Sequence, residues 1–199
     1  MSAVAIDREL TAHDLVDLYR QGIFPMAGSD GPIVLHRPRR RAIFDLELIA
    51  MDPTTARHLR TQRFGITVDR CFEEVMRRCA DREETWIDER LIAAYTELHR
   101  QGLAHSVESW RGGMLVGGIY GVSIGAAFFG ESLFGMNNAG KAAFHELVRR
   151  LRQGGYLLFD SQYINDFTRA LGAFETDAAD FDRRLRQALK HEARFPCDV

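Results

Sequence analysis

The sequence has few cysteines and no long apolar run. Its 199 residues include three cysteines, Cys71, Cys79 and Cys197, with no C-x-x-C pair among them. An odd number of scattered thiols indicates reduced cysteines in a cytosol rather than a disulfide framework or a zinc site. No apolar run reaches the roughly 18 residues of a membrane span, and the opening "MSAVAIDREL" carries charge where a signal peptide is apolar. We therefore expect a soluble, cytoplasmic protein with no membrane segment.

The common catalytic and metal-binding motifs are also missing. The seven histidines are scattered, with no H-E-x-x-H, and the chain has no G-x-S-x-G. The sequence thus predicts no metal site, no nucleophile triad and no cofactor. Net charge is −2, so any contact with nucleic acid must come from a local basic patch. The length suits one domain, or one domain with a small appendage.

The N-terminal part reads as a short helix followed by turns. Residues 11–21 predict a helix with an N-cap at Thr11, and the proline- and glycine-rich stretch 22–32 predicts turns without regular structure. "IVLHRPRRRAIF" then predicts two short strands broken at Pro38. We place a domain boundary near residue 40, which divides the chain into a small N-terminal domain, 1–40, and a main domain, 41–199.

The main domain reads as α+β. The predicted helices span 53–61, 69–80, 88–101, 138–153, 164–171 and 179–192, and the predicted strands span 64–68, 104–110, 113–121, 125–131 and 156–160. An antiparallel meander, a helix and a further strand are typical of an acetyltransferase-like (GNAT) mixed sheet. Such enzymes hold the CoA pyrophosphate with an Arg/Gln-x-x-Gly-x-Gly/Ala loop, but "ESLFGMNNAGK" stands in its place. The pattern therefore favours an acyl donor other than CoA.

Two strand ends carry the candidate catalytic residues. Asp160 and Gln162 close the apolar run "YLLF" and, at i and i+2, are predicted to share one face. Glu131 closes the neighbouring run "GAAFFG". The ordinary alternatives are a helix cap near Ile164 for Asp160 and an exposed turn for Glu131. Trp86, considered alone, is expected to be a packing residue.

Other candidates also have ordinary alternatives. Tyr95 and Phe128 are more often core residues than ligand contacts, and Ser132 fits a turn. A run of arginines, either a solvated strand edge or a contact to tRNA phosphates, comprises Arg37, Arg39, Arg40 and Arg41. A second basic face lies at 183–194.

Six motifs follow one another in order from about residue 10 to 175: "YRQGIFPM", "DREETWI", "AYTELHRQGLAHSVESW", "LVGGIYGV", "FFGESLF" and "GGYLLFDSQ…NDFTRALGA". Together they resemble the bacterial leucyl/phenylalanyl-tRNA–protein transferases. The resemblance implies a small N-terminal domain on a GNAT-like domain. It also implies transfer of Leu or Phe, and Met less well, from aminoacyl-tRNA to proteins with N-terminal Arg or Lys. The product N-terminus would mark those proteins for degradation by the N-degron route.

The resemblance also implies roles for individual residues. Asp160 and Gln162 match the catalytic strand end, and Glu131 matches the Glu of the "GES" word between Gly130 and Ser132. We expect Gln162 to orient the attacking amine and Asp160 to fix Gln162 and attract positive charge. Glu131 pairs either with the acceptor or with the tRNA end. The positions matching the aminoacyl-adenosine site and its side-chain pocket are Tyr19, Met26, Trp86, Tyr95, Phe128, Leu147 and Leu151.

An aminoacyl ester is already activated, so positioning and proton removal suffice for transfer. The sequence departs from the family at Met26, where Trp is usual, and in the segments "LHRPRRR" and "GMNNAGK". Two alternatives stay open: a divergent transferase with another amine acceptor, and a non-catalytic tRNA- or degron-binding relative. A monomer is the default expectation.

Overall fold

The computed structural model describes residues 4–28, 31–61, 63–136 and 138–197 and contains two sheets. The strands of the smaller sheet, in the order β1-β3-β2, are β1 (Val4–Ile6), β2 (Phe24–Ala27) and β3 (Ile33–His36). The larger sheet has the order β10-β4-β9-β8-β7-β6-β5. Its strands are β4 (Arg40–Phe44), β5 (Gly65–Val68), β6 (Ala104–Arg111), β7 (Met114–Ile124), β8 (Ala127–Gly135), β9 (Leu158–Gln162) and β10 (Phe174–Asp177).

The predicted helices are all present, with no end shifted by more than four residues. They are α1 (Ala12–Arg20), α2 (Pro53–Arg60), α3 (Phe72–Ala80), α4 (Glu89–Arg100), α5 (Ala139–Gln153), α6 (Asp166–Ala170) and α7 (Ala178–Ala188). Helix α1 begins with the capping box that Thr11 and Asp14 predict, each side chain accepting from the other's backbone N–H.

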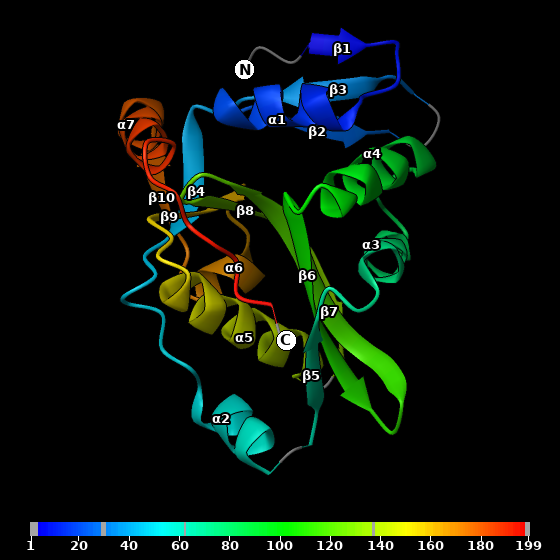
Figure 1. Cartoon of the computed structure of the whole chain (residues 1–199), viewed down its shortest axis with the longest axis vertical. Coiled ribbons are helices and arrows are strands. Elements are labelled where there is room, and N and C mark those ends of the chain that lie inside the picture. The colour runs from blue at the N-terminus through cyan, green and yellow to red at the C-terminus, as the bar shows by residue number, and fades with distance from the viewer. Residues whose placement is uncertain (1–3, 29–30, 62, 137, 198–199) are drawn as a thin grey trace.

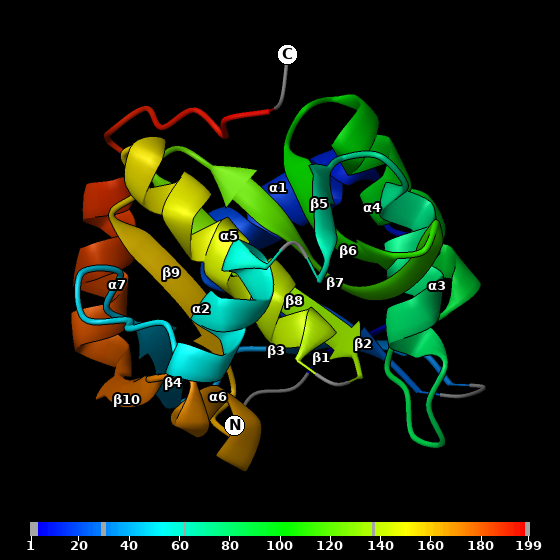
Figure 2. The same ribbon diagram turned by 90° about the horizontal axis from the view of Figure 1, so that it is seen from below.

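The larger sheet is mixed and is covered on both faces. Strands β5 to β8 form an antiparallel meander, and β9 returns parallel to β8 after α5. Helix α5 packs on one face (Figure 2), where its buried side chains join Phe128 and Phe159. The other face lies against α1, α3, α4 and α7, with Phe129 buried there (Figure 1). The adjacent Phe128 and Phe129 thus face opposite cores, as strand alternation requires.

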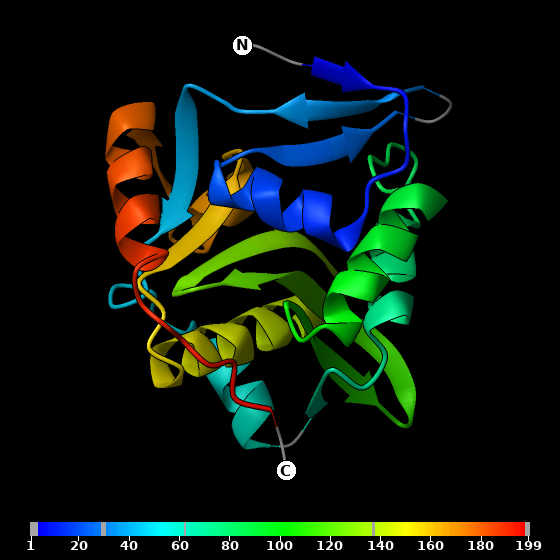
Figure 3. The same cartoon turned by 45° about the horizontal axis from the view of Figure 1, so that its top comes forward.

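The smaller sheet lies across one end of the larger one, with α1 between them (Figure 3). The expectation of turns without regular structure over 22–32 is wrong for Phe24–Ala27, which forms β2. Residues 29–30 of that stretch lie outside the described residues. Pro25 fits because β2 pairs with β3 alone and is an edge strand, where a missing N–H costs no ladder bond. The short strands β1 and β10 were not predicted.

Glycines bring α5 close to the meander. A Cβ on Gly117 of β7 would lie 2.6 Å from the carbonyl carbon of Ala139, and one on Gly140 would lie 2.7 Å from Leu133. The first turn of α5 therefore sits directly on β7 and β8, beside the cavity described below. Among the described residues, no helix is long and apolar enough to cross a membrane.

Candidate active site

Strands β8 and β9 part at the two strand ends that the sequence singles out. Their parallel pairing covers Ala127–Phe129 against Leu158–Asp160. Just beyond it, each strand carries a bulge against its other neighbour. Gly130 and Ser132 pair with consecutive residues of β7, which leaves Glu131 as the extra residue. Asp160 and Gln162 pair with consecutive residues of β4, which leaves Ser161 as the extra one. Bulges next to active sites commonly redirect side chains.

A cavity of about 490 Å³ opens where the strands part, a size typical of small-molecule sites. Its apolar floor is formed by Phe44, Ile119, Leu133, Phe144 and Phe159. Its polar wall includes Arg82, Glu131, Ser132, Gln162, Tyr163, Asn165 and Thr168. Among the described residues that line the cavity there is one carboxylate and no His or Cys. This set of side chains does not fit a metal site.

Glu131 and Gln162 form the polar centre of the cavity. The Gln162 side-chain amide donates to Glu131 Oε1 at 2.7 Å. The Tyr95 hydroxyl donates to Glu131 Oε2 at 3.4 Å. Burial raises the pKa of Glu131 to about 8; the Tyr19 hydroxyl opposes that shift, and the Asp160 carboxylate adds to it. Glu131 therefore exchanges its proton near the pH at which an α-amino group does.

The backbone at Gln162 is held in an unusual conformation. Its φ is +54°, in the left-handed region that non-glycine residues seldom adopt. The Gln162 backbone N–H donates to Asp160 Oδ1 at 3.0 Å. Residues in such conformations persist when their surroundings hold them, and they cluster at functional sites.

Asp160 is fully buried and paired with Arg41. The Arg41 guanidinium donates to the two carboxylate oxygens at 2.9 and 2.5 Å and to the Gly22 carbonyl at 2.9 Å. It also lies between the rings of Phe24 and Phe181, 4.7 and 4.6 Å from their centroids. Although the sequence predicts that Asp160 shares one face with Gln162, Asp160 is 0% exposed and does not line the cavity. It reaches the site through the Gln162 backbone.

The arginines of the basic run at residues 37–41 do not share one environment: one is buried and the others are exposed. Arg41 is 1% exposed and bound to Asp160, so the expectation that it contacts tRNA phosphates is wrong. Arg37 is exposed and pairs with Asp182 at 2.9 Å, and Arg40 lies 4.0 Å from Glu175. Arg39 is exposed. Adjacent residues of a strand point to opposite faces, so Arg41 turns inward where Arg40 points outward.

The two tyrosines lie behind the cavity wall. Tyr19 and Tyr95 are fully buried, and their hydroxyls hydrogen-bond each other. Burial, together with the nearby Glu131 carboxylate, raises the pKa of both well above the usual value. Both hydroxyls hydrogen-bond the Glu131 carboxyl group.

Six further predicted site residues separate into two groups. Trp86, Gly130 and Ser132 line the cavity. Phe128, Leu147 and Leu151 are buried in the core below α5 and do not line it, so their expected contact with the aminoacyl group is wrong for this cavity. Phe44, Phe144 and Phe159 form the floor instead.

Met26 is half-buried and packs against the core on the other face of the sheet. Its neighbour Ala27 donates its backbone N–H to the Trp86 carbonyl at 2.9 Å. The smaller sheet is therefore tied to the loop that carries Trp86.

Sequence reasoning missed several wall residues. Arg82, in the loop after α3, donates to Ser132 Oγ at 2.6 Å. Tyr163 shares a hydrogen bond of 3.0 Å with His36 of β3. Asn165 and Thr168 form the capping box of α6 at the rim. "DREETWI" and "DSQYINDFT" contain these residues, but nothing in their local pattern separates them from loop and cap residues.

Comparison with known proteins identifies the class of protein as an aminoacyltransferase. The family model for leucyl/phenylalanyl-tRNA protein transferase matches residues 43–186, and that for the N-terminal domain of the same family matches residues 8–39. The chain belongs to the leucyl/phenylalanyl-tRNA protein transferase family.

The relatives that carry that name include two that match nearly the whole chain. The protein from Rubrobacter xylanophilus is 47% identical over 188 residues, covering 94% of this chain and 98% of its own. The one from Paramagnetospirillum magneticum is 45% identical over 195 residues, covering 94% and 93%. Among solved structures, L-PGS from Bacillus licheniformis matches 92% of this chain and 64% of its own at 11% identity, with a TM-score of 0.43, too distant to carry an argument.

Proposed function

We propose that the protein transfers Leu or Phe, and Met less well, from aminoacyl-tRNA to the α-amine of proteins with N-terminal Arg or Lys. The product would mark those proteins for degradation by the N-degron route. One observation carries the proposal: the Glu131–Gln162 pair stands over a floor of three phenylalanines and Ile119. Such a floor accepts a large apolar side chain and discriminates weakly among Leu, Phe and Met.

The reaction needs a proton to be removed from the acceptor amine, and it needs the amine and the ester to be oriented toward each other. The acceptor's neutral α-amine nitrogen attacks the ester carbonyl carbon, a C–N bond forms, and the ester C–O bond breaks. The proton that the nitrogen loses passes to the leaving oxygen, which departs as the terminal adenosine hydroxyl. The ionised form of Glu131 takes the proton of the α-ammonium, and because its pKa of about 8 is close to that of the amine, this transfer costs little free energy. Gln162 orients the reacting groups through its side-chain amide. Its donor and acceptor atoms are fixed by the hydrogen bond to Glu131.

Asp160 and Arg41 are positioning residues in this mechanism. Asp160 holds the Gln162 backbone N–H, and Arg41 holds Asp160. Because Arg41 also binds the Gly22 carbonyl and packs on Phe24, it connects the N-terminal part to the site.

We further propose that tRNA lies along the basic side formed by Arg39 and the groove that contains Arg20, Arg37 and Arg186. The division near residue 40 and the GNAT-like assignment are proposals as well; the parting of β8 and β9 supports the second. An active monomer is part of the proposal. A charged-tRNA donor suits a cytoplasmic reaction.

The test is transfer of labelled Leu or Phe from charged tRNA to two peptides that differ at residue one, Arg against Ala. We expect label on the Arg peptide alone. Equal labelling of both peptides would favour a divergent transferase with another acceptor rule. Binding of the charged tRNA without labelling of either peptide would favour a non-catalytic relative.

A further inference from the structure

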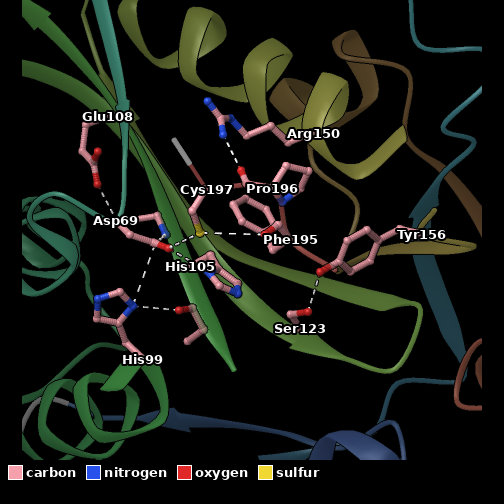
Figure 4. A network of polar contacts seen from close by, with 12 residues as sticks. Asp69, His99, His105, Glu108, Ser123, Arg150, Tyr156, Phe195, Pro196 and Cys197 are labelled. Carbon is pink, nitrogen blue, oxygen red and sulfur yellow. Dashed lines mark hydrogen bonds and ion pairs between the residues drawn. The ribbon is translucent and has the colours of Figure 1, made fainter. Parts of the chain in front are cut away.

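A second cluster of reactive side chains lies away from the cavity, where the C-terminal tail crosses the larger sheet. Asp69 follows β5, His105 lies on β6 and Cys197 lies in the tail, and one ligand atom from each falls within 4.8 Å of the other two. Figure 4 shows the three side chains converging. We propose that Asp69, His105 and Cys197 form a binding site for a zinc-like divalent metal ion.

The Asp69 carboxylate is already oriented for this role. Asp69 has a φ of +56°, and its Oδ1 accepts from the Ser106 backbone N–H at 2.8 Å. Its Oδ2 then lies 2.8 Å from His105 Nδ1 and 3.5 Å from Cys197 Sγ. A tetrahedral zinc site separates such ligand atoms by roughly 3.4–3.6 Å. The metal would replace the proton between Asp69 and His105, and those two side chains would move apart by about half an ångström.

The tail is held so that Cys197 reaches the cluster. The Phe195 ring stacks on the His105 ring with centroids 4.2 Å apart and an interplanar angle of 10°, and it is buried against Phe128. Arg150 of α5 hydrogen-bonds the Pro196 carbonyl. Both contacts fix the backbone just before Cys197, so the sulfur does not depend on a loose tail for its position.

The donor set suits zinc. A thiolate, an imidazole nitrogen and a carboxylate oxygen are typical zinc ligands, and thiolate with carboxylate balances a divalent charge. Three protein ligands leave a fourth position for water. His99 stands close behind, with its Nδ1 3.9 Å from Asp69 Oδ1 and 2.8 Å from the Ala104 carbonyl. The ligands are spread along the chain from residue 69 to 197, which is why no motif predicts the site.

The test is a titration of the full chain with Co²⁺, whose thiolate complexes show a sulfur-to-cobalt charge-transfer absorption. We expect one equivalent to produce the band and Zn²⁺ to abolish it. Cys197→Ser should remove the band, whereas Cys71→Ser, at a cysteine outside the cluster, should keep it. Asp69→Asn tolerates the same backbone conformation and should weaken binding by at least about 10- to 100-fold, the cost of losing even an indirect partner.

A second readout is independent of the cobalt spectrum. Zn²⁺ should slow amide hydrogen exchange in the tail, residues 193–197, in the unsubstituted protein but not in Cys197→Ser. A band that persists in Cys197→Ser, or no band at one equivalent and no change in exchange, would overturn the proposal. Neither outcome bears on the transferase reaction, which uses other residues.

Discussion

Removing the buried carboxylate of Asp160 should lower both the free energy of unfolding and the turnover, for two different physical reasons. Asp160 and Arg41 are 0% and 1% exposed. Asp160→Ala leaves the Arg41 guanidinium buried without its counter-charge, which costs about 3–5 kcal/mol out of a typical total of about 5–15 kcal/mol. For a chain of this size, Tm should fall by roughly 6–20 °C. The Gln162 backbone N–H also loses its acceptor, so turnover should fall more than donor binding.

The double variant Arg41→Met/Asp160→Ala distinguishes the two reasons. It removes the unpaired charge and leaves an apolar chain between Phe24 and Phe181, so most of the lost stability should return. Turnover should not return, because the Gln162 N–H still lacks its partner. Urea unfolding gives the free energies, and single-turnover transfer from charged tRNA gives the rates. An unchanged stability in Asp160→Ala, or recovery of turnover in the double variant, would contradict the roles assigned to Arg41 and Asp160.

Four further predictions concern the cavity and the proposed tRNA surface. Gln162→Gly should keep the free energy of unfolding within about 1 kcal/mol, since glycine relieves the left-handed backbone, while transfer is lost; a large loss of stability would contradict this. Glu131 holds in the folded state a proton that the unfolded chain, with a pKa near 4.5, has released. The free energy of unfolding should therefore fall as pH rises toward about 8, and Glu131→Gln should remove this decrease. The same decrease between about pH 5 and 8.5 in both proteins, measured by urea unfolding, would refute it. Ile119→Phe should shrink the floor and reduce kcat/KM for Phe-tRNA about tenfold more than for Leu-tRNA, and parallel losses would place the side chain elsewhere. Arg39→Ala should reduce the salt dependence of tRNA binding; an unchanged slope would remove Arg39 from the tRNA surface.

Much of the fold could be predicted because its helices and central strands are long and periodic. Helix α5 and the β6–β7–β8 meander emerge from apolar spacing and glycine turns. The strands that were missed are short, and β2 contains Pro25, which local rules assign to a turn; only pairing with β3 makes it a strand. Edge strands of this kind depend on a partner that is distant in sequence.

The candidate site could be predicted in part. Glu131 and Gln162 stand out as polar residues at the ends of apolar strands, and the fold brings them within hydrogen-bonding distance. The two bulges could not be predicted, because they are defined by register against neighbouring strands. The burial of Arg41 was hidden by the surrounding arginines, whose run reads as a solvated edge. Its partner Asp160 is 119 residues away.

The most direct test is a structure with a non-hydrolysable 3′-aminoacyl-adenosine analogue that carries Phe. We expect the phenyl ring to lie against Phe144 and Phe159, and the carbonyl group to lie beside the Gln162 amide and Glu131. Binding of the analogue elsewhere, with the cavity between β8 and β9 empty, would contradict it.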